Sequence, residues 1–136
     1  MQRQVVVGSP AYFRRHPPPR TPADLVHHDC IRHRLSSGRL MPYEFTRNGR
    51  DFEVEVNGRL IFNDSGLARE AARAGLGLSQ QFEAEAAADL ANGTLQRVLD
   101  DDLEPFPGFF IYYPAREHMA PKLRVFIDFL REQVAA

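Results

Sequence analysis

The sequence has little of what marks several large classes of protein. It contains one cysteine, Cys30, which excludes an internal disulfide framework and indicates a reducing compartment. No apolar run approaches the roughly 20 residues that a membrane-spanning helix needs. The first ten residues, MQRQVVVGSP, hold only three consecutive valines and do not read as a signal peptide. The formal net charge of -1 excludes the broad basic field of a nucleic-acid-binding domain. These absences predict a cytoplasmic protein.

The composition is that of a globular domain. The 136 residues are 43% hydrophobic and 26% charged, and this length is enough to bury one core. Neither repeats nor low-complexity tracts interrupt the sequence. We therefore expect a single compact body rather than an array or a tail.

Short strands alternate with helices along the chain, as hydrophobic periodicity and turn residues indicate. The expected strands cover Val5–Val7, residues 29–35, Tyr43–Arg47, Phe52–Val56, Leu60–Phe62, a segment near Leu78, residues 95–99 and Phe109–Tyr113. The expected helices cover Ala11–Arg15, a stretch from Ser65 to Gly75, Phe82–Ala91 and an amphipathic stretch from Pro121. This alternation favours an α/β fold with a mostly parallel sheet flanked by helices.

The strand over residues 29–35 has a predicted inner and outer face. Ile31 and Leu35 fall on the apolar face, whereas Cys30, Arg32 and Arg34 fall on the other.

The stretch from Asn63 to Gln81, NDSGLAREAARAGLGLSQQ, combines a helix start with small side chains. Asp64 or Ser65 can cap the helix, the alanines allow it to lie close to a sheet, and Gly75 can end it. Helix N-termini gather at the carboxyl ends of parallel strands, where ligands bind, and their free amides favour anions. The stretch therefore predicts either a binding edge or an ordinary capped helix without a ligand.

The sequence offers no convincing metal or catalytic site. His28 and Cys30 would share one face of a strand, with His33 on the other, so one ion could not collect all three. Cys30 has no evident orienting acid or oxyanion loop, which argues against a thiol nucleophile. The acidic run Asp100–Glu104 is expected to be a solvated loop, and the short basic clusters RRH and RHR to be surface charge. We expect no cofactor, no metal and no enzymatic activity.

The order of several motifs resembles one family. The segments VVVGSPAYF, TPADL, HDCIRH, LIFNDSGLAREAARAGLGLS, LANGTLQRVL, YPAR and LRVFIDFL are similar to the effector-binding domain of LysR-type transcriptional regulators, over nearly the whole chain. The resemblance implies a periplasmic-binding-protein-like fold, with two α/β subdomains around a small-molecule cleft. It further implies that the chain holds the second subdomain (residues 9–110) and remnants of the first (residues 1–8 and 111–136), without a helix-turn-helix.

The resemblance also implies where the cleft lies. The residues carried over as ligand-binding are Ser9, Leu35, Ser36, Ser37, Asp64 and Ser65. Their hydroxyls and amides could hold a carboxylate or another polar molecule. The strand after Gly77 departs from the family pattern, because Gln80 and Gln81 replace an apolar run and make this edge more polar.

These features predict a small-molecule effector-sensing domain that contacts DNA only through a separate domain. The terminal helix carries an apolar stripe (Leu123, Phe126, Ile127 and Leu130) that was shaped to pack on a sheet, so a homodimer is expected. An oligomerisation module without ligand binding remains the alternative. A solute-binding protein is disfavoured because no export signal is seen.

Overall fold

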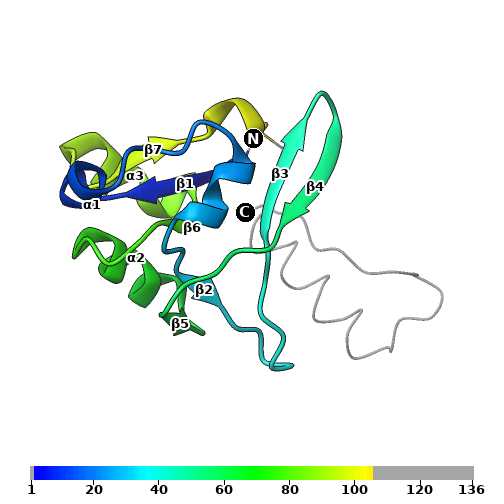
Figure 1. Cartoon of the computed structure of the whole chain (residues 1–136), viewed down its shortest axis with the longest axis horizontal. Coiled ribbons are helices and arrows are strands. Elements are labelled where there is room, and N and C mark those ends of the chain that lie inside the picture. Colours follow the sequence, from blue (N-terminus) through cyan, green and yellow to red (C-terminus); the bar gives the residue numbers. More distant parts are fainter. Residues whose placement is uncertain (1, 106–136) are drawn as a thin grey trace, which may run out of the picture. The chain divides into compact units, whose positions relative to one another are not determined.

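The computed structural model describes residues 2–105 of the chain (Figure 1). The chain divides into two units, one of residues 3–105 and the other of residues 1–2 and 106–136. The strand expected over Phe109–Tyr113 and the helix expected from Pro121 lie outside the described residues. The unit of residues 3–105 includes the strand that we expected to belong with the terminal remnants; the subdomain boundary of a complete regulator stays a prediction.

The described elements follow the expected order. The strands are β1 (Gln4–Gly8), β2 (Arg32–His33), β3 (Tyr43–Arg47), β4 (Arg50–Val54), β5 (Ile61–Phe62), β6 (Ser79–Phe82) and β7 (Gln96–Val98). The helices are α1 (Pro10–Arg15), α2 (Ser65–Arg73) and α3 (Glu83–Asn92), together with the short 3₁₀ helices η1 (Pro22–His27) and η2 (Asp100–Asp102).

Over residues 2–105 the strands form mixed sheets rather than the mostly parallel sheet that we expected, because β1 runs against both of its neighbours. β1 lies between β6 and β7 and pairs with both in the antiparallel sense, so β6 and β7 run in the same direction. A parallel bridge between Cys30 and Leu78 joins β6 to the chain before β2, and β2 pairs in parallel with β5. The helix α3 thus connects two strands, β6 and β7, that run in the same direction, and β1 lies between these two strands in the sheet.

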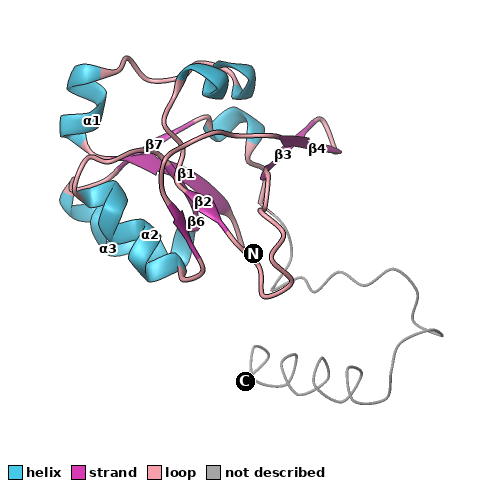
Figure 2. Cartoon of the chain, turned by 60° about the horizontal axis from the view of Figure 1, so that its bottom comes forward, coloured by secondary structure: helices cyan, strands magenta, loops and turns pink. Residues whose placement is uncertain are grey.

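Both faces of this sheet are covered, which explains why the valine run of β1 is buried throughout. Val5 and Val7 pack with Ile31 against the alanines of α2 and α3. Val6 packs on the other face with residues of α1, η1 and the β3–β4 hairpin. Figure 2 shows α2 and α3 on one side of the strands. The alanines of α2 leave room for its backbone to lie close to the sheet, as expected.

Two local expectations were wrong. The segment 29–35 is an isolated bridge followed by a two-residue strand, and Cys30 is fully buried whereas Leu35 is 38% exposed. This happens because both faces are covered at Cys30, while Leu35 lies past the end of β2. The acidic run is not simply solvated, since Asp102 is 1% exposed and pairs with Arg47.

The β3–β4 hairpin has the turn that its sequence predicts. Asn48 and Gly49 both have positive φ, 53° and 75°, which is the geometry of a two-residue hairpin turn. The hairpin places Glu44 directly opposite Glu53. Burial raises the pKa of the Glu44 carboxyl, and the charges of Glu53 and Asp51 raise it further. Like charges at a directly opposed position oppose pairing of the two strands.

Replacing Glu53 with lysine is therefore expected to stabilise the chain, because it converts a repulsive cross-strand pair into an attractive one. The free energy of unfolding should rise by about 0.2–1 kcal/mol in urea denaturation at low salt, and less at 1 M salt. Glu55→Lys is the control, since Glu55 lies beyond the last paired residue of β4. A lower stability for Glu53→Lys, or an equal gain for the control, would contradict this reading.

A hydrogen bond between Tyr12 and His28 connects α1 to the segment that follows η1. The two side chains meet with the Tyr12 hydroxyl 2.6 Å from His28 Nδ1. Burial raises the pKa of Tyr12 to about 12, so the phenol keeps its proton, and the tautomer of His28 decides which of the two groups donates. Burial lowers the pKa of His28, the charges of His16 and His27 lower it further, and Asp24 acts in the opposite direction.

The burial of His28 makes stability sensitive to mild acid. Since the pKa of His28 is lower in the folded chain than its ordinary value of about 6.5, the unfolded chain binds more protons, and stability falls as the pH drops below 6.5. His28→Asn keeps an acceptor but cannot titrate, so it is expected to lose less stability between about pH 7.5 and 5.5. Urea denaturation at both pH values tests this; equal losses in the two proteins would refute it.

Candidate functional site

The candidate site lies at the carboxyl ends of β2 and β5. These ends lie side by side, because the Arg34 backbone N–H donates to the Phe62 carbonyl at 2.8 Å. The chain leaves β2 into a loop over residues 34–41 and leaves β5 into α2. In open α/β sheets this edge is where ligands bind. We call the loop residues 34–39 and the α2 start at 64–67 the site edge.

The start of α2 is built as the sequence predicts. Asp64 is the N-cap, and its Oδ1 accepts a hydrogen bond from the Leu67 backbone N–H at 3.0 Å. The Ser65 hydroxyl lies 3.2 Å from Glu85 Oε2 and donates to it. Both residues are exposed. The Asp64 carboxylate thus caps α2, and the Ser65 hydroxyl connects the start of α2 to α3.

The loop beside this helix start is a tight turn. The Leu35 N–H donates to the Arg39 carbonyl and the Gly38 N–H donates to the Leu35 carbonyl, both at 2.8 Å. Gly38 has a φ of 88°, which a glycine adopts without strain. Leu35, Ser36 and Ser37 are exposed at the turn. The structure therefore brings these three residues to the same sheet edge as Asp64 and Ser65.

Ser9 does not join them. Its hydroxyl caps α1 by accepting from the Tyr12 N–H at 3.1 Å, and its side chain is buried. Because β1 runs against the other strands, its carboxyl end and Ser9 lie at the opposite edge of the sheet, close to Gly75. Whether any of the expected residues binds a ligand stays a prediction.

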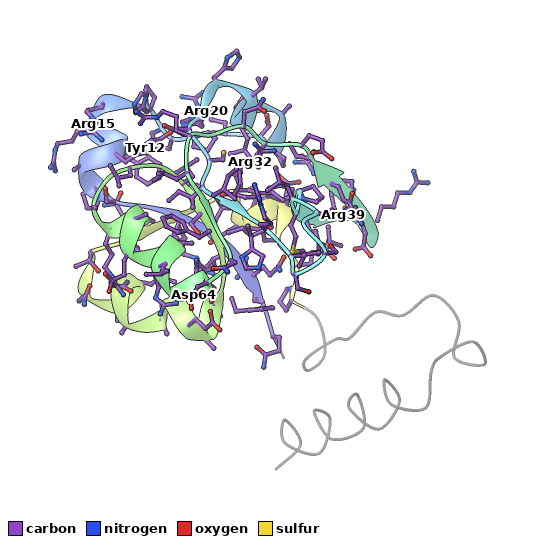
Figure 3. The ribbon with its side chains drawn as sticks, turned by 90° about the horizontal axis from the view of Figure 1, so that it is seen from below. Tyr12, Arg15, Arg20, Arg32, Arg39 and Asp64 are labelled. Atoms are coloured by element: carbon purple, nitrogen blue, oxygen red, sulfur yellow. The ribbon has the colours of Figure 1, made fainter. Side chains whose placement is uncertain are left out.

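Positive charge gathers on the loop side of the site edge. Arg32, Arg34 and Arg39 lie within a run from Arg32 to Tyr43 that has no acidic residue. Within residues 2–105, none of these three arginines lies within ion-pair distance of a carboxylate. Figure 3 labels Arg32, Arg39 and Asp64 among the side chains. We expect the RHR cluster to be surface charge, and in the structure Arg34 is exposed and Arg32 half-buried; the acid-free run around them distinguishes them from the other surface arginines.

The side chain of Gln81 on β6 connects the start of α2 to the sheet. This side chain is 3% exposed, and its Nε2 donates to the Ser65 carbonyl at 3.1 Å and to the Ser79 hydroxyl at 2.9 Å. Its Oε1 accepts from Arg69 at 3.3 Å. At Gln81, the polar residue that departs from the family pattern is therefore buried and stabilises the start of α2 by hydrogen bonds.

Gln80 points to the other face and holds the hairpin. Its Oε1 accepts from the Glu44 backbone N–H at 2.9 Å, and its Nε2 donates to the Glu44 carbonyl at 2.7 Å. The side-chain amide thus pairs with β3 as a neighbouring strand would. Neither glutamine is simply an exposed polar group of the edge.

Other chemistry is poorly supported in the described part of the chain. Burial raises the pKa of the Cys30 thiol to about 12, so the thiol stays protonated and is a poor nucleophile. Residues 2–105 hold no group of three or more His, Cys, Asp or Glu side chains able to hold a metal ion. None of the helices over these residues has the length and apolar character needed to cross a bilayer.

Known proteins with similar sequences and folds are bacterial regulators. A transcriptional regulator of Pseudomonas aeruginosa is 45% identical over 130 residues, which cover 95% of this chain and 42% of that protein. YagP of Escherichia coli, named as a LysR family substrate binding domain-containing protein, is 37% identical over 107 residues, covering 77% of this chain and 78% of YagP. This chain spans less than half the length of the Pseudomonas regulator.

The fold comparison agrees with these relatives. The solved structure of CrgA, a LysR-type transcriptional regulator from Neisseria meningitidis, matches with a TM-score of 0.67 at 20% identity, over 99% of this chain and 46% of that one. At this identity the likeness shows the fold, which is the periplasmic-binding-protein-like α/β fold expected above. A family profile described as the LysR substrate binding domain matches residues 1–135. The chain therefore belongs to the LysR substrate-binding domain family.

Proposed function

We propose that this chain senses a small molecule on behalf of a transcriptional regulator, and that the molecule binds at the site edge through an anionic group. The observation that carries this proposal is the joining of three unpaired arginines, a serine-bearing turn and a helix N-terminus at one edge of the sheet. The family assignment supports the sensing role, and the local charge supports the anionic class.

The chemistry of the edge favours a carboxylate or phosphate over a neutral molecule. Guanidinium groups present paired donors that match the two oxygens of such anions, and charge-assisted bonds are stronger than neutral ones. Arg34 and Arg39 are exposed and Arg32 is half-buried, so all three retain access to solvent. The hydroxyls of Ser36 and Ser37 would add neutral hydrogen bonds, which orient a ligand without adding charge.

The wider role follows from the same family. The chain has no catalytic activity of its own in this proposal, works in the cytoplasm as a dimer, and contacts DNA only through a separate domain. Ligand binding would bias the arrangement of the two subdomains, since a ligand shifts an equilibrium by as much as it prefers one state.

Binding of benzoate, succinate and inorganic phosphate by isothermal titration calorimetry tests the proposed site. At least one of these anions is expected to bind, whereas benzamide, the neutral analogue of benzoate, is not. Arg34→Gln and Arg39→Gln should each weaken binding about tenfold, because each removes a charge-assisted bond. Arg50→Gln at the hairpin tip is the control and should bind as the unchanged chain does. Equal binding of benzamide, or an equal loss with Arg50→Gln, would overturn the anionic site.

An oligomerisation module is the second candidate, and exposed apolar side chains favour it. Leu67 on α2 is 53% exposed and Ile61 on β5 is 37% exposed. This alternative predicts that none of the anions binds, while sedimentation velocity shows a tight dimer. Binding of an anion by a monomer would exclude it.

A further inference from the structure

A cavity lies outside the site edge, on the face of the sheet that carries α1 and η1. It has a volume of about 250 Å³ and lies between η1 and the proline segment that follows α1. Its lining consists of His16, Asp24, His27, His28 and the prolines at 17–19. We call it the histidine pocket. No residue of the site edge lines it, so it is a separate feature of the chain.

The histidines of this pocket leave most of their ring nitrogens without a protein partner. Nδ1 of His28 meets the Tyr12 hydroxyl at 2.6 Å. Within residues 2–105, no hydrogen bond or ion pair reaches Nε2 of His28 or either ring nitrogen of His16 and His27. The His16 ring is held by packing, since it stacks on Tyr12 with ring centroids 4.7 Å apart. An imidazole nitrogen that stays unpaired beside a cavity can donate to or accept from a ligand.

The charge of the histidine pocket comes from Asp24, which is the carboxylate in its lining. The backbone N–H groups of Arg20 and Thr21 each donate to Asp24 Oδ2 at 3.0 Å and lower the pKa of this carboxyl, so it is ionised at neutral pH. Burial and the charges of the other two histidines lower the pKa of His28, against the charge of Asp24. At pH 7.5 the pocket therefore presents a negative charge beside the neutral imidazole of His28.

The arginines near this pocket in sequence neither line it nor pair with Asp24. None of Arg14, Arg15 and Arg20 is in the lining, and none forms an ion pair with a carboxylate in the described part of the chain. The Arg15 guanidinium instead donates to the Gly75 carbonyl at 2.6 Å. The charged and titratable groups that act on the pKa of His28 are the ones that line the pocket: His16, Asp24 and His27.

This set of groups selects one class of ligand. A metal ion is disfavoured, because the described residues hold no group of three or more side chains able to ligate one. An anion would be repelled by the Asp24 carboxylate. A planar organic cation suits the pocket better, because its N–H groups can donate to the carboxylate and to neutral ring nitrogens. Its flat face can also lie against the imidazole rings and the prolines.

We propose that the histidine pocket binds a small organic cation that carries a guanidinium or amidinium group. Asp24 supplies the opposite charge, and His16, His27 and His28 supply hydrogen-bond acceptors. Protons compete with this ligand, because a protonated His28 places a like charge in the pocket and loses an acceptor. The site differs from the site edge in place and in the charge of its ligand, so it does not depend on the proposed function.

Amide chemical shifts of the ¹⁵N-labelled full chain test the pocket at about pH 7.5. The probes are benzamidinium and methylguanidinium, each compared with its neutral analogue, benzamide or methylurea. At least one cation is expected to give saturable shifts at the amides of His16, Asp24, His27 and His28, whereas neither neutral analogue is. At about pH 5.5 the same cation is expected to bind more weakly, in a sample whose spectrum shows that the chain is still folded.

Three variants separate the charge of the pocket from its structure. In Asp24→Asn the side chain can still accept the two backbone N–H bonds but carries no charge, so binding should weaken about tenfold. His27→Ala removes an exposed side chain and one neutral acceptor, should weaken binding about threefold, and guards against misfolding of Asp24→Asn. Asp51→Asn is the matched control, because Asp51 is an exposed, hydrogen-bonded aspartate of the hairpin, and it should leave binding unchanged.

Absence of saturable shifts at the pocket with both cations would overturn the proposal, and so would equal binding of a neutral analogue. Tighter binding at about pH 5.5 than at about pH 7.5, or an equal loss in Asp51→Asn, would also overturn it. Binding of an anion at residues 34–39 and 64–67 is a separate result. The histidine pocket and the proposed function can therefore fail independently.

Discussion

The complete burial of Val5–Val7 is the constraint on which the rest of the structure depends. Successive side chains of a strand point to opposite faces, so these three valines can all be buried only if both faces of the sheet are covered. α2 and α3 cover one face, and α1, η1 and the hairpin cover the other. The sheet therefore exposes its ends rather than its faces, and the loops at one of these ends form the site edge. Removing either cover would leave valines in water.

Local chemistry made much of the fold predictable. Ser9 and Asp64 start helices because their side chains accept free amide hydrogens, and Asn48-Gly49 turns a hairpin because both positions tolerate positive φ. The direction of β1 could not be predicted, since its partners lie more than 70 residues away and no local pattern specifies them. The burial of Asp102 depends in the same way on a distant arginine, so a run of aspartates looked like a solvated loop.

The candidate site was predictable in part, because some of its features depend on local sequence and others on contacts between residues far apart in the chain. The family resemblance implied that the turn after β2, the start of α2 and Ser9 line one cleft, and the rule that ligands bind at the carboxyl ends of parallel strands favoured the start of α2 as well. Ser9 was grouped with them although it follows the opposed strand. The lack of a carboxylate partner for Arg32, Arg34 and Arg39 could not be predicted in full, because it depends on which distant side chains the fold brings near them. Gln81, which was expected to make this edge more polar, is instead buried and hydrogen-bonds to the Ser65 carbonyl at the start of α2.

The most direct test of the central claim is a map of amide chemical shifts during titration of the ¹⁵N-labelled chain with benzoate. If the site edge binds the anion, the largest saturable shifts will fall on residues 34–39 and 64–67, and the amides around Ser9 and Gly75 will not move. Saturable shifts centred on that opposite edge, or shifts that grow linearly over the whole surface without saturating, would contradict the account.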